Sequence, residues 1–312
     1  MNSLPQALLD RLKSIYWENG QKNVISWFSS KRKTTFRINT LKSSKEEIEN
    51  YLKEKSIPFG EVDFLKWVYV TWKEYEYTLK WSDIFYSWKI YVQWISSMLP
   101  VYFMGLENKD VVLDMTAAPG SKTTQMSAIM ENSWKIYALE QNKIRFDKLN
   151  YNIKLQWATN VETLKMDARK IEEKFNDGFF DKILLDAPCS AEWRISLENE
   201  KSFGFWSLKN IQDKNVLQEE LLEIAFKKLK SWWVLIYSTC TLAPEENEEV
   251  INYILEKHPS LSIAEISLEN ELATKWITWF GWKSYSQELS KTIRIMPSEL
   301  TEGFFMAKLR KS

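Results

Sequence analysis

Both cysteines of this chain follow predicted strands, where a thiol could act as a nucleophile. Cys189 comes after the apolar run of residues 181–186, and Cys240 comes after the run of residues 233–239. Two cysteines cannot form a disulfide framework, and with a single histidine in the chain we expect no metal centre. A lone cysteine is usually a small buried apolar residue, but two at the ends of consecutive strands favour a shared chemical role.

A thiol reacts as its thiolate, which nearby amide dipoles stabilise. Cys240 lies just ahead of a helix predicted over residues 244–257, which starts with Pro244 and has four glutamates near its beginning. The only histidine, His258, is at the far end of that helix, so we do not expect it to activate the thiol. The chemistry alone leaves open which of the two thiols attacks.

Acidic residues end the other predicted strands. The run of residues 111–115 leads into the loop 116–122, and Glu140, Asp167 and Asp186 end the next three strands. Ligands bind beyond the carboxyl ends of parallel strands, and a carboxylate about 20 residues after the first loop is where a ribose is held. The loop matches neither the dinucleotide glycine pattern nor a phosphate loop. We therefore expect a nucleoside ligand, with Asp167 accepting a hydrogen bond from an adenine amine.

Strands alternate with helices from residue 109 onward. The apolar runs 111–115, 135–140, 161–167, 181–186, 233–239 and 304–309 are separated by helical patterns at about 121–130, 142–153, 212–230 and 244–257. This alternation predicts an α/β fold with a Rossmann-like, doubly wound sheet over residues 106–312. The segments 203–209 and 268–292 show no clear pattern.

The first 105 residues predict a smaller N-terminal α+β domain. Its expected elements are a helix at 4–16, a strand at 35–41, a helix at 43–55 capped by Ser43, strands within 66–79 and a helix at 95–104. Arg32, Lys33 and Arg37 lie near aromatic residues, which suits a nucleic-acid face, although a solvated loop before a strand explains them equally well.

Composition excludes several classes of protein. The 312 residues carry 42 Lys+Arg and 42 Asp+Glu, which argues against a strongly basic protein that binds nucleic acid mainly through its charge. An apolar content of 45% excludes bulk disorder. The sequence has no long apolar run and no secretory pattern, so we expect a cytoplasmic protein without a membrane span.

The glycine and tryptophan contents are unusual. Glycine normally makes up about 7% of a protein, or about 22 residues here, but this chain has 8 glycines and 16 tryptophans. Several tryptophans stand in turn-like contexts, at 87–89, 133–135, 155–158 and 230–234, where a left-handed backbone suits glycine. Our hypothesis is that the host reads as glycine a codon that the printed sequence renders as tryptophan. The alternative is a protein that is simply rich in tryptophan.

Three segments resemble the Sun/Nop family of RNA (cytosine-5) methyltransferases. They are Asp-Met-Thr-Ala-Ala-Pro-Gly-Ser-Lys-Thr-Thr (114–124), Leu-Asp-Ala-Pro-Cys-Ser (185–190) and Tyr-Ser-Thr-Cys-Thr-Leu-Ala-Pro-Glu-Glu-Asn (237–247). Arg37 and Asn39 also match, as does the segment 294–308, so the resemblance runs from about residue 34 to the end. The paired Pro-Cys and Thr-Cys motifs are its most specific part. It implies a fold of the S-adenosylmethionine-dependent methyltransferase type, with residues 1–105 as an RNA-binding domain.

The resemblance also implies roles for the site residues. Cys240 would add to carbon 6 of cytosine, Asp186 would face ring nitrogen 3 and the amino group, and Cys189 would assist loss of the carbon 5 proton. The cofactor would be S-adenosylmethionine, held by Thr116, Ala117, Ala118, Pro119, Gly120, Ser121, Lys122, Glu140, Arg145, Asp167 and Asp186. The partner would be tRNA or rRNA, contacted by Arg32, Lys33 and Arg37. We expect a monomer, with no metal and no membrane.

This chain departs from the family pattern at several positions. Thr116 stands where the family has Cys, Ser121 stands where it has Gly, and the segments 191–194 and 231–233 lack the family's glycines. Trp193 would lie near the cytosine and could block the pocket, whereas Trp206 matches a tryptophan expected in the family. A blocked pocket would make this a catalytically inactive RNA-binding protein on the same fold.

Two other methyltransferase classes fit the motifs less well. DNA cytosine methyltransferases have the Pro-Cys motif without Thr-Cys on the next strand. Methyltransferases of proteins or small molecules would show Asn-Pro-Pro-Tyr at the fourth strand, which this chain lacks.

Overall fold

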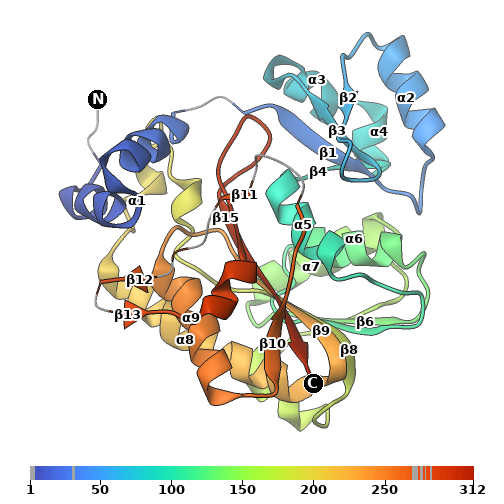
Figure 1. The fold of residues 1–312 in the computed structure, drawn as a ribbon. Coiled ribbons are helices and arrows are strands. Elements are labelled where there is room, and N and C mark those ends of the chain that lie inside the picture. Colours follow the sequence, from blue (N-terminus) through green and yellow to red (C-terminus); the bar gives the residue numbers. More distant parts are fainter. Residues whose placement is uncertain (1–3, 30–31, 269–272, 275–276, 278, 282) are drawn as a thin grey trace.

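The computed structural model describes residues 4–29, 32–268, 273–274, 277, 279–281 and 283–312, which form a large sheet and a small one (Figure 1). The large sheet has the strand order β11-β14-β15-β9-β8-β5-β6-β7, with β10 beside β15. Its parallel part consists of β5 (Val111–Asp114), β6 (Lys135–Leu139), β7 (Val161–Leu164), β8 (Phe180–Asp186) and β9 (Leu229–Thr239). This is the α/β sheet that the alternating pattern predicts.

Antiparallel strands extend the sheet beyond β9. They are β15 (Phe304–Lys311), β14 (Ile293–Ile295), β11 (Ala273–Thr274) and β10 (Leu261–Ala264). A separate hairpin joins β12 (Trp279–Phe280) to β13 (Lys283–Ser284), and η6 (Gln287–Lys291) follows it. Part of the patternless segment 268–292 lies outside the described residues.

Helices cover both faces of the large sheet because successive strand residues point in opposite directions. Leu185 belongs to the core beneath α8 (Leu208–Lys228) and α9 (Glu248–Lys257). Leu184 belongs to the core beneath α5 (Ile95–Phe103) and α6 (Ser121–Ile129). The remaining elements near the sheet are α7 (Lys143–Leu155), η2 (Ala168–Glu173), η3 (Glu192–Arg194), η4 (Glu200–Ser202) and η5 (Pro244–Glu246).

The small sheet is antiparallel and has its own core. Its strand order is β2 (Gly60–Glu61), β3 (Val68–Thr71), β1 (Thr34–Ile38) and β4 (Ile90–Val92). It packs with α2 (Lys45–Glu54), α3 (Glu76–Lys80) and α4 (Asp83–Tyr86) around buried residues such as Phe36, Ile48 and Tyr69. An α+β arrangement is what the sequence predicts for this region.

Two local predictions in this region are wrong. Of the residues expected in strands over 66–79, only 68–71 form a strand, because η1 (Lys73–Tyr75) and α3 follow and bury Leu79 through a helical turn. The cap of α2 is Ser44, whose hydroxyl accepts from the Glu47 N–H, while Ser43 donates to the Glu47 side chain instead.

Two helices of the first 105 residues, one near the beginning and one near the end, pack with the large sheet and its loops. Helix α1 (Gln6–Trp27) is longer than predicted, and its Leu8 and Leu12 share a core with Trp193 and Leu242. Helix α5 packs against α6, β9 and β15. No helix among the described residues has the length and apolar character needed to cross a bilayer.

Six tryptophans have a left-handed backbone, with φ between 52° and 72°. They are Trp17, Trp67, Trp88, Trp134, Trp157 and Trp232. Four of the six lie in the turns that the sequence singles out as suited to glycine. The left-handed conformation costs a residue with a Cβ about 1–2 kcal/mol, and glycine avoids this cost.

Candidate active site

The two thiols lie side by side at the carboxyl end of the large sheet. Strands β8 and β9 pair in parallel with Asp186 opposite Ser238, so the loops that follow them leave the sheet together. The Sγ atoms of Cys189 and Cys240 are 3.4 Å apart. The expectation that both thiols share one site, which follows from their places after neighbouring strands, is met.

A cleft of about 680 Å³ opens beside the thiols. Cys240, Asp186 and Lys122 are among its lining residues, together with Pro119 and Ser121 of the loop after β5, whereas Cys189 is not. A volume of this size is in the usual range for a small-molecule or cofactor site. Of the two thiols, that of Cys240 is therefore the one in the wall of the cleft.

Asp186 is held from two sides. Lys122 Nζ lies 2.6 Å from its Oδ2, and the Ser238 hydroxyl donates to its Oδ1 at 2.8 Å. Lys122, whose side chain is 9% exposed, also donates to the Ser97 hydroxyl at 2.8 Å. Sequence reasoning missed Ser97 and Ser238. The one signal in the sequence was the place of Ser238 near the end of β9, two residues before Cys240.

The two thiols differ in their electrostatic surroundings. The hydrogen bond with Cys240 and the burial of the side chain raise the pKa of Cys189 well above its usual value. Cys189 therefore keeps its proton and can donate it toward the Cys240 sulfur.

The loop between β5 and α6 forms a small-residue cradle. Gly120 has φ 103°, and a Cβ at this position would lie 3.0 Å from the Leu149 side chain. Asp114, which precedes the loop, is buried and accepts from the Thr123 hydroxyl at 2.6 Å, and burial raises its pKa to about 6. Because backbone amides at the start of α6 face this end of the sheet, a polar ligand can approach closely.

Glu140 and Arg145 lie next to this cradle. The Glu140 side chain is 4% exposed, and its Oε1 accepts from the Asn142 N–H. Arg145 Nη1 is 3.4 Å from Glu140 Oε2, and its Nη2 donates to the Ala118 carbonyl at 2.7 Å. Arg145 thus ties the carboxylate that follows β6 to the loop after β5.

Asp167 follows β7 at the same edge of the sheet and caps η2. Its carboxylate accepts from both the backbone and the side chain of Arg169, which lowers its pKa. Its contact with adenine stays a prediction.

The three basic residues expected to contact RNA have different surroundings. Arg32 lines the cleft, lies over the Trp94 ring and is 3.3 Å from Glu302. Lys33 lies over the Trp72 ring and pairs with Glu299 at 2.9 Å.

Arg37 is buried, and this corrects the expectation that it contacts RNA. Its guanidinium donates to Gln93, Thr124, Gln156 and the Ser121 carbonyl, so it joins β1 to α6 and to the residue after α7. Burial lowers its pKa to about 10.

Trp193 lies in the wall of the cleft without filling it. The side chain is 2% exposed and packs edge-on against Phe28 of the α1 segment. Its ring lies against Gly303, where a Cβ would come within 1.7 Å of it. The cleft of about 680 Å³ is present with Trp193 in its wall, and obstruction of the cytosine by Trp193 stays a prediction.

Comparison with known proteins agrees with this site. The family described as 16S rRNA methyltransferase RsmB/F matches residues 101–310. The tRNA (cytosine(49)-C(5))-methyltransferase of Pyrococcus abyssi is 38% identical over 285 residues, covering 89% of this chain and 88% of that protein. The ribosomal RNA small subunit methyltransferase F of Psychromonas ingrahamii is 33% identical over 320 residues, and the chain spans only 63% of its length.

Solved structures show the same fold. A methyltransferase homolog from Pyrococcus horikoshii has a TM-score of 0.85 and 29% identity, with 99% of this chain and 95% of that chain covered. NSun6 from the same organism, solved with the S-adenosylmethionine analogue SFG, has a TM-score of 0.81 and 25% identity, with 98% of each chain covered. This chain therefore belongs to the RsmB/F (Sun/Nop) family of S-adenosylmethionine-dependent RNA (cytosine-5) methyltransferases.

Proposed function

We propose that this protein methylates carbon 5 of a cytosine in tRNA or rRNA, with Cys240 as the nucleophile, Cys189 as the proton acceptor and Asp186 as the group that holds the base. The observation that carries the proposal is the 3.4 Å separation of the two sulfur atoms next to a cleft lined by Cys240 and Asp186. A single pyrimidine in this cleft could meet both residues.

Cys240 acts first because carbon 5 of cytosine is a weak nucleophile. The thiolate forms a bond to carbon 6, and the electrons of the 5,6 double bond move onto carbon 5 and toward nitrogen 3. Asp186 relays a proton from the Lys122 ammonium to nitrogen 3 and so neutralises the charge that develops there. Lys122, 2.6 Å from Asp186, keeps that carboxylate in place beside the ring.

Cys189 acts last. Its pKa is raised mainly by the hydrogen bond with Cys240, and that bond is weakened once the Cys240 sulfur is bonded to carbon 6. Cys189 can then release its proton to bulk water and, as a thiolate, accept the proton that leaves carbon 5. The 5,6 double bond reforms, and the electron pair of the carbon–sulfur bond returns to Cys240.

Bound S-adenosylmethionine supplies the electrophilic methyl group for this reaction. The residues that would hold it are the 116–122 loop, Glu140 and Arg145, whose small side chains and paired charges suit a nucleoside with an amino-acid part. Asp167 is the candidate for the adenine contact.

The target base has to leave its stack to reach Cys240, which is easiest in a loop or a single strand. We place tRNA first among the two RNA classes, because the tRNA methyltransferase relative matches over 88% of its own length and the rRNA methyltransferase relative over 63%. Arg32, which lines the cleft, and the adjacent Lys33 are the candidates for contacts with the RNA backbone.

The test is transfer of a labelled methyl group to purified host tRNA and, separately, to 16S rRNA, followed by bisulfite sequencing of the product. Wild-type protein should label one of the two RNAs at a cytosine, and Cys240→Ala should label neither. Turnover by Cys240→Ala would overturn the assignment of the nucleophile. A wild-type protein that binds RNA without labelling it would favour the inactive RNA-binding alternative.

A further inference from the structure

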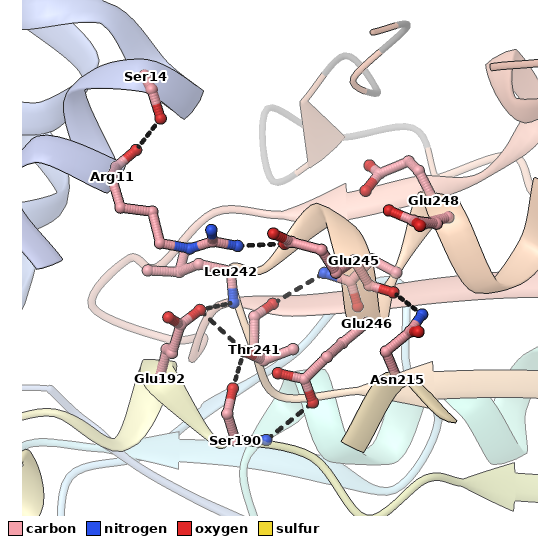
Figure 2. Close-up of polar contacts among 12 residues, drawn as sticks. Arg11, Ser14, Ser190, Glu192, Asn215, Thr241, Leu242, Glu245, Glu246 and Glu248 are labelled. Atoms are coloured by element: carbon pink, nitrogen blue, oxygen red, sulfur yellow. Dashed lines mark hydrogen bonds and ion pairs between the residues drawn. The ribbon is translucent and has the colours of Figure 1, made fainter. Parts of the chain in front are cut away.

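The loops that carry the two thiols are held by buried carboxylates, and each carboxylate comes from the other thiol's segment (Figure 2). Glu192 lies three residues after Cys189, and its Oε2 accepts from the Thr241 hydroxyl at 2.9 Å and from the Leu242 N–H at 3.0 Å. Glu192 thus holds the loop of Cys240.

Glu246 makes the reverse connection. It lies six residues after Cys240, and its Oε2 accepts from the Ser190 N–H at 2.9 Å and from Gln218 Nε2 at 2.9 Å. Gln218 Nε2 also donates to the Pro188 carbonyl at 3.0 Å. The backbone is therefore held on both sides of Cys189, directly at Ser190 and through Gln218 at Pro188.

A hydroxyl pair joins the two loops between these carboxylates. Ser190 Oγ and Thr241 Oγ1 are 2.7 Å apart, and each hydroxyl belongs to the residue directly after a cysteine. Together these contacts hold the residues on either side of Cys189 and the two residues that follow Cys240. Such a network restricts the distance between the thiols more than strand pairing alone would.

Both carboxylates are buried at a cost. Glu192 is 1% exposed and Glu246 is 0% exposed, and among the described ion pairs neither has a cationic partner. One oxygen of Glu246 and the side-chain oxygen of Gln218 are buried without a hydrogen-bond partner. An apolar pair would be less costly at such a position, so a functional reason for these carboxylates is favoured.

We propose that Glu192 and Glu246 are positioning residues that keep the Cys189 and Cys240 sulfur atoms in contact by each holding the loop of the other thiol. The proposal deepens the two-thiol mechanism proposed above. An experiment that tests it has to report the positions of the two thiols independently of methyl transfer.

The chain offers such a readout because Cys189 and Cys240 are its only cysteines. Diamide takes up one hydrogen from each thiol as an S–S bond forms, and intact mass shows the loss of two hydrogens. The rate of this step in the folded protein reports how often the two sulfur atoms meet. The variants are Glu246→Ala, Glu246→Gln, Glu192→Ala and Glu192→Gln, and thermal unfolding identifies those that fold.

Glutamine at 246 keeps an acceptor for Ser190 and adds a donor, so Glu246→Gln should form the disulfide within about threefold of the wild-type rate. Glu246→Ala and Glu192→Ala should lower both the rate of disulfide formation and kcat by about 10-fold to 100-fold, because a displacement of about 1 Å has effects of this size on reacting groups. The KM for RNA should change less. The matched control is Glu245→Gln, because Glu245 is adjacent in the sequence but its carboxylate pairs with Arg11 of α1 instead of with either thiol loop. It should behave as wild type.

Wild-type rates of disulfide formation and methyl transfer in both alanine variants would overturn the proposal. If the alanine variants do not fold, the test rests on Glu246→Gln. A Glu246→Gln variant that folds but forms the disulfide far more slowly than the expected threefold range would overturn the proposal as well. A wild-type protein that forms the disulfide rapidly while Cys240→Ala still methylates RNA would instead refute the mechanism proposed above.

A second inference rests on the backbone and is independent of the thiols. Six of the ten described non-glycine residues with positive φ are tryptophans. Five of these six side chains are exposed, so apolar burial does not compensate for the strained backbone: Trp17, Trp67, Trp134, Trp157 and Trp232. The geometry points to glycine as the residue that the host inserts at all six positions, including Trp88.

The backbone identifies the positions to test. Trp72 and Trp81 are also exposed, but their φ angles of −67° and −103° suit any residue. Trp72 and Trp81 therefore serve as matched controls for the six tryptophans with positive φ. The inference does not extend to Trp206, whose Nε1 donates to Glu192 at 2.7 Å.

Mass spectrometry of peptides from the protein made by its own host is the decisive measurement. Glycine at the six positions is expected, and tryptophan there would overturn the inference. With protein made from the printed sequence, Trp134→Gly and Trp157→Gly should each raise the melting temperature by about 2–4 °C, whereas Trp72→Gly should not. Equal effects at test and control positions would also count against it.

Discussion

Lys122 Nζ lies 2.6 Å from Asp186 Oδ2 at the edge of the cleft, with the lysine side chain 9% exposed. A nearly buried cation therefore supports one oxygen of the carboxylate, while Ser238 donates to the other. Since both oxygens have fixed partners, the carboxylate has one orientation before any base enters the cleft.

The Asp186→Asn variant tests the role of this carboxylate. Asparagine keeps nearly the same shape but cannot share a proton with nitrogen 3, so kcat should fall by about 10²–10⁴-fold. Affinity for RNA should change by less than about threefold, because the base contact is a small part of the interface. Single-turnover methyl transfer and filter binding measure the two quantities, and Asp213→Asn on the exposed face of α8 is the control. An unchanged kcat would remove Asp186 from the mechanism.

Cys189→Ala tests the last step of the proposed mechanism. Cys240 should still add to carbon 6, but loss of the carbon 5 proton should be slow, so a covalent protein–RNA adduct should accumulate. Denaturing gels of reactions with labelled RNA detect it. The double variant Cys189→Ala/Cys240→Ala should give no adduct. If Cys189→Ala releases methylated RNA without adduct, Cys189 has only a packing role.

The large sheet and the convergence of the thiols were predictable because both follow from one rule. Parallel strands end at the same edge, so Cys189 and Cys240 after neighbouring strands had to approach one another. The contacts of Glu192 and Glu246 were not predictable in this way. They join residues 50 and 56 positions apart through turns, and turns carry no periodic pattern.

Arg37 shows why a local pattern misleads. A basic residue among aromatic residues suits RNA contact, and the sequence places Arg37 in such a context. The structure surrounds it with acceptors from three separate segments, including Gln93, Thr124 and Gln156. No property of the residues next to Arg37 indicates that these acceptors meet there.

Arg37→Met should therefore lower stability rather than RNA affinity. Removing the guanidinium leaves several buried acceptors unpaired, and the free energy of unfolding should fall by about 2–4 kcal/mol. Urea unfolding measures this change. Lys143→Met, at a side chain that is 72% exposed, should change it by less than about 0.5 kcal/mol. A stable Arg37→Met variant with weakened RNA binding would restore the RNA contact that the structure argues against.

Glu246 should make stability depend on pH. Burial raises its pKa to about 7 from an ordinary value of 4.5, so below pH 4.5 the group is protonated in both the folded and the unfolded chain and has no effect. Between these values the unfolded chain ionises first, and folding loses free energy until about pH 7. Glu246→Gln removes this loss and should gain up to about 3 kcal/mol over the wild type as pH rises from 4.5 to 7. Urea unfolding at several pH values measures the difference, and a gain that is the same at all of them would contradict the expected protonation.

Arg32 and Lys33 remain the basic residues that we propose to contact RNA. Arg32 lines the cleft, Lys33 follows it in the chain, and each side chain lies over an aromatic ring and beside a glutamate. Replacing either with glutamine should weaken RNA binding at low salt and reduce the slope of log K against log [salt] by about 1, because one phosphate contact is lost. Filter binding over a range of KCl concentrations gives the slope. Lys143→Gln, on α7, removes one exposed charge without facing the cleft and should leave the slope unchanged. Equal slopes for all three variants and the wild type would show that the RNA backbone is held elsewhere on the protein.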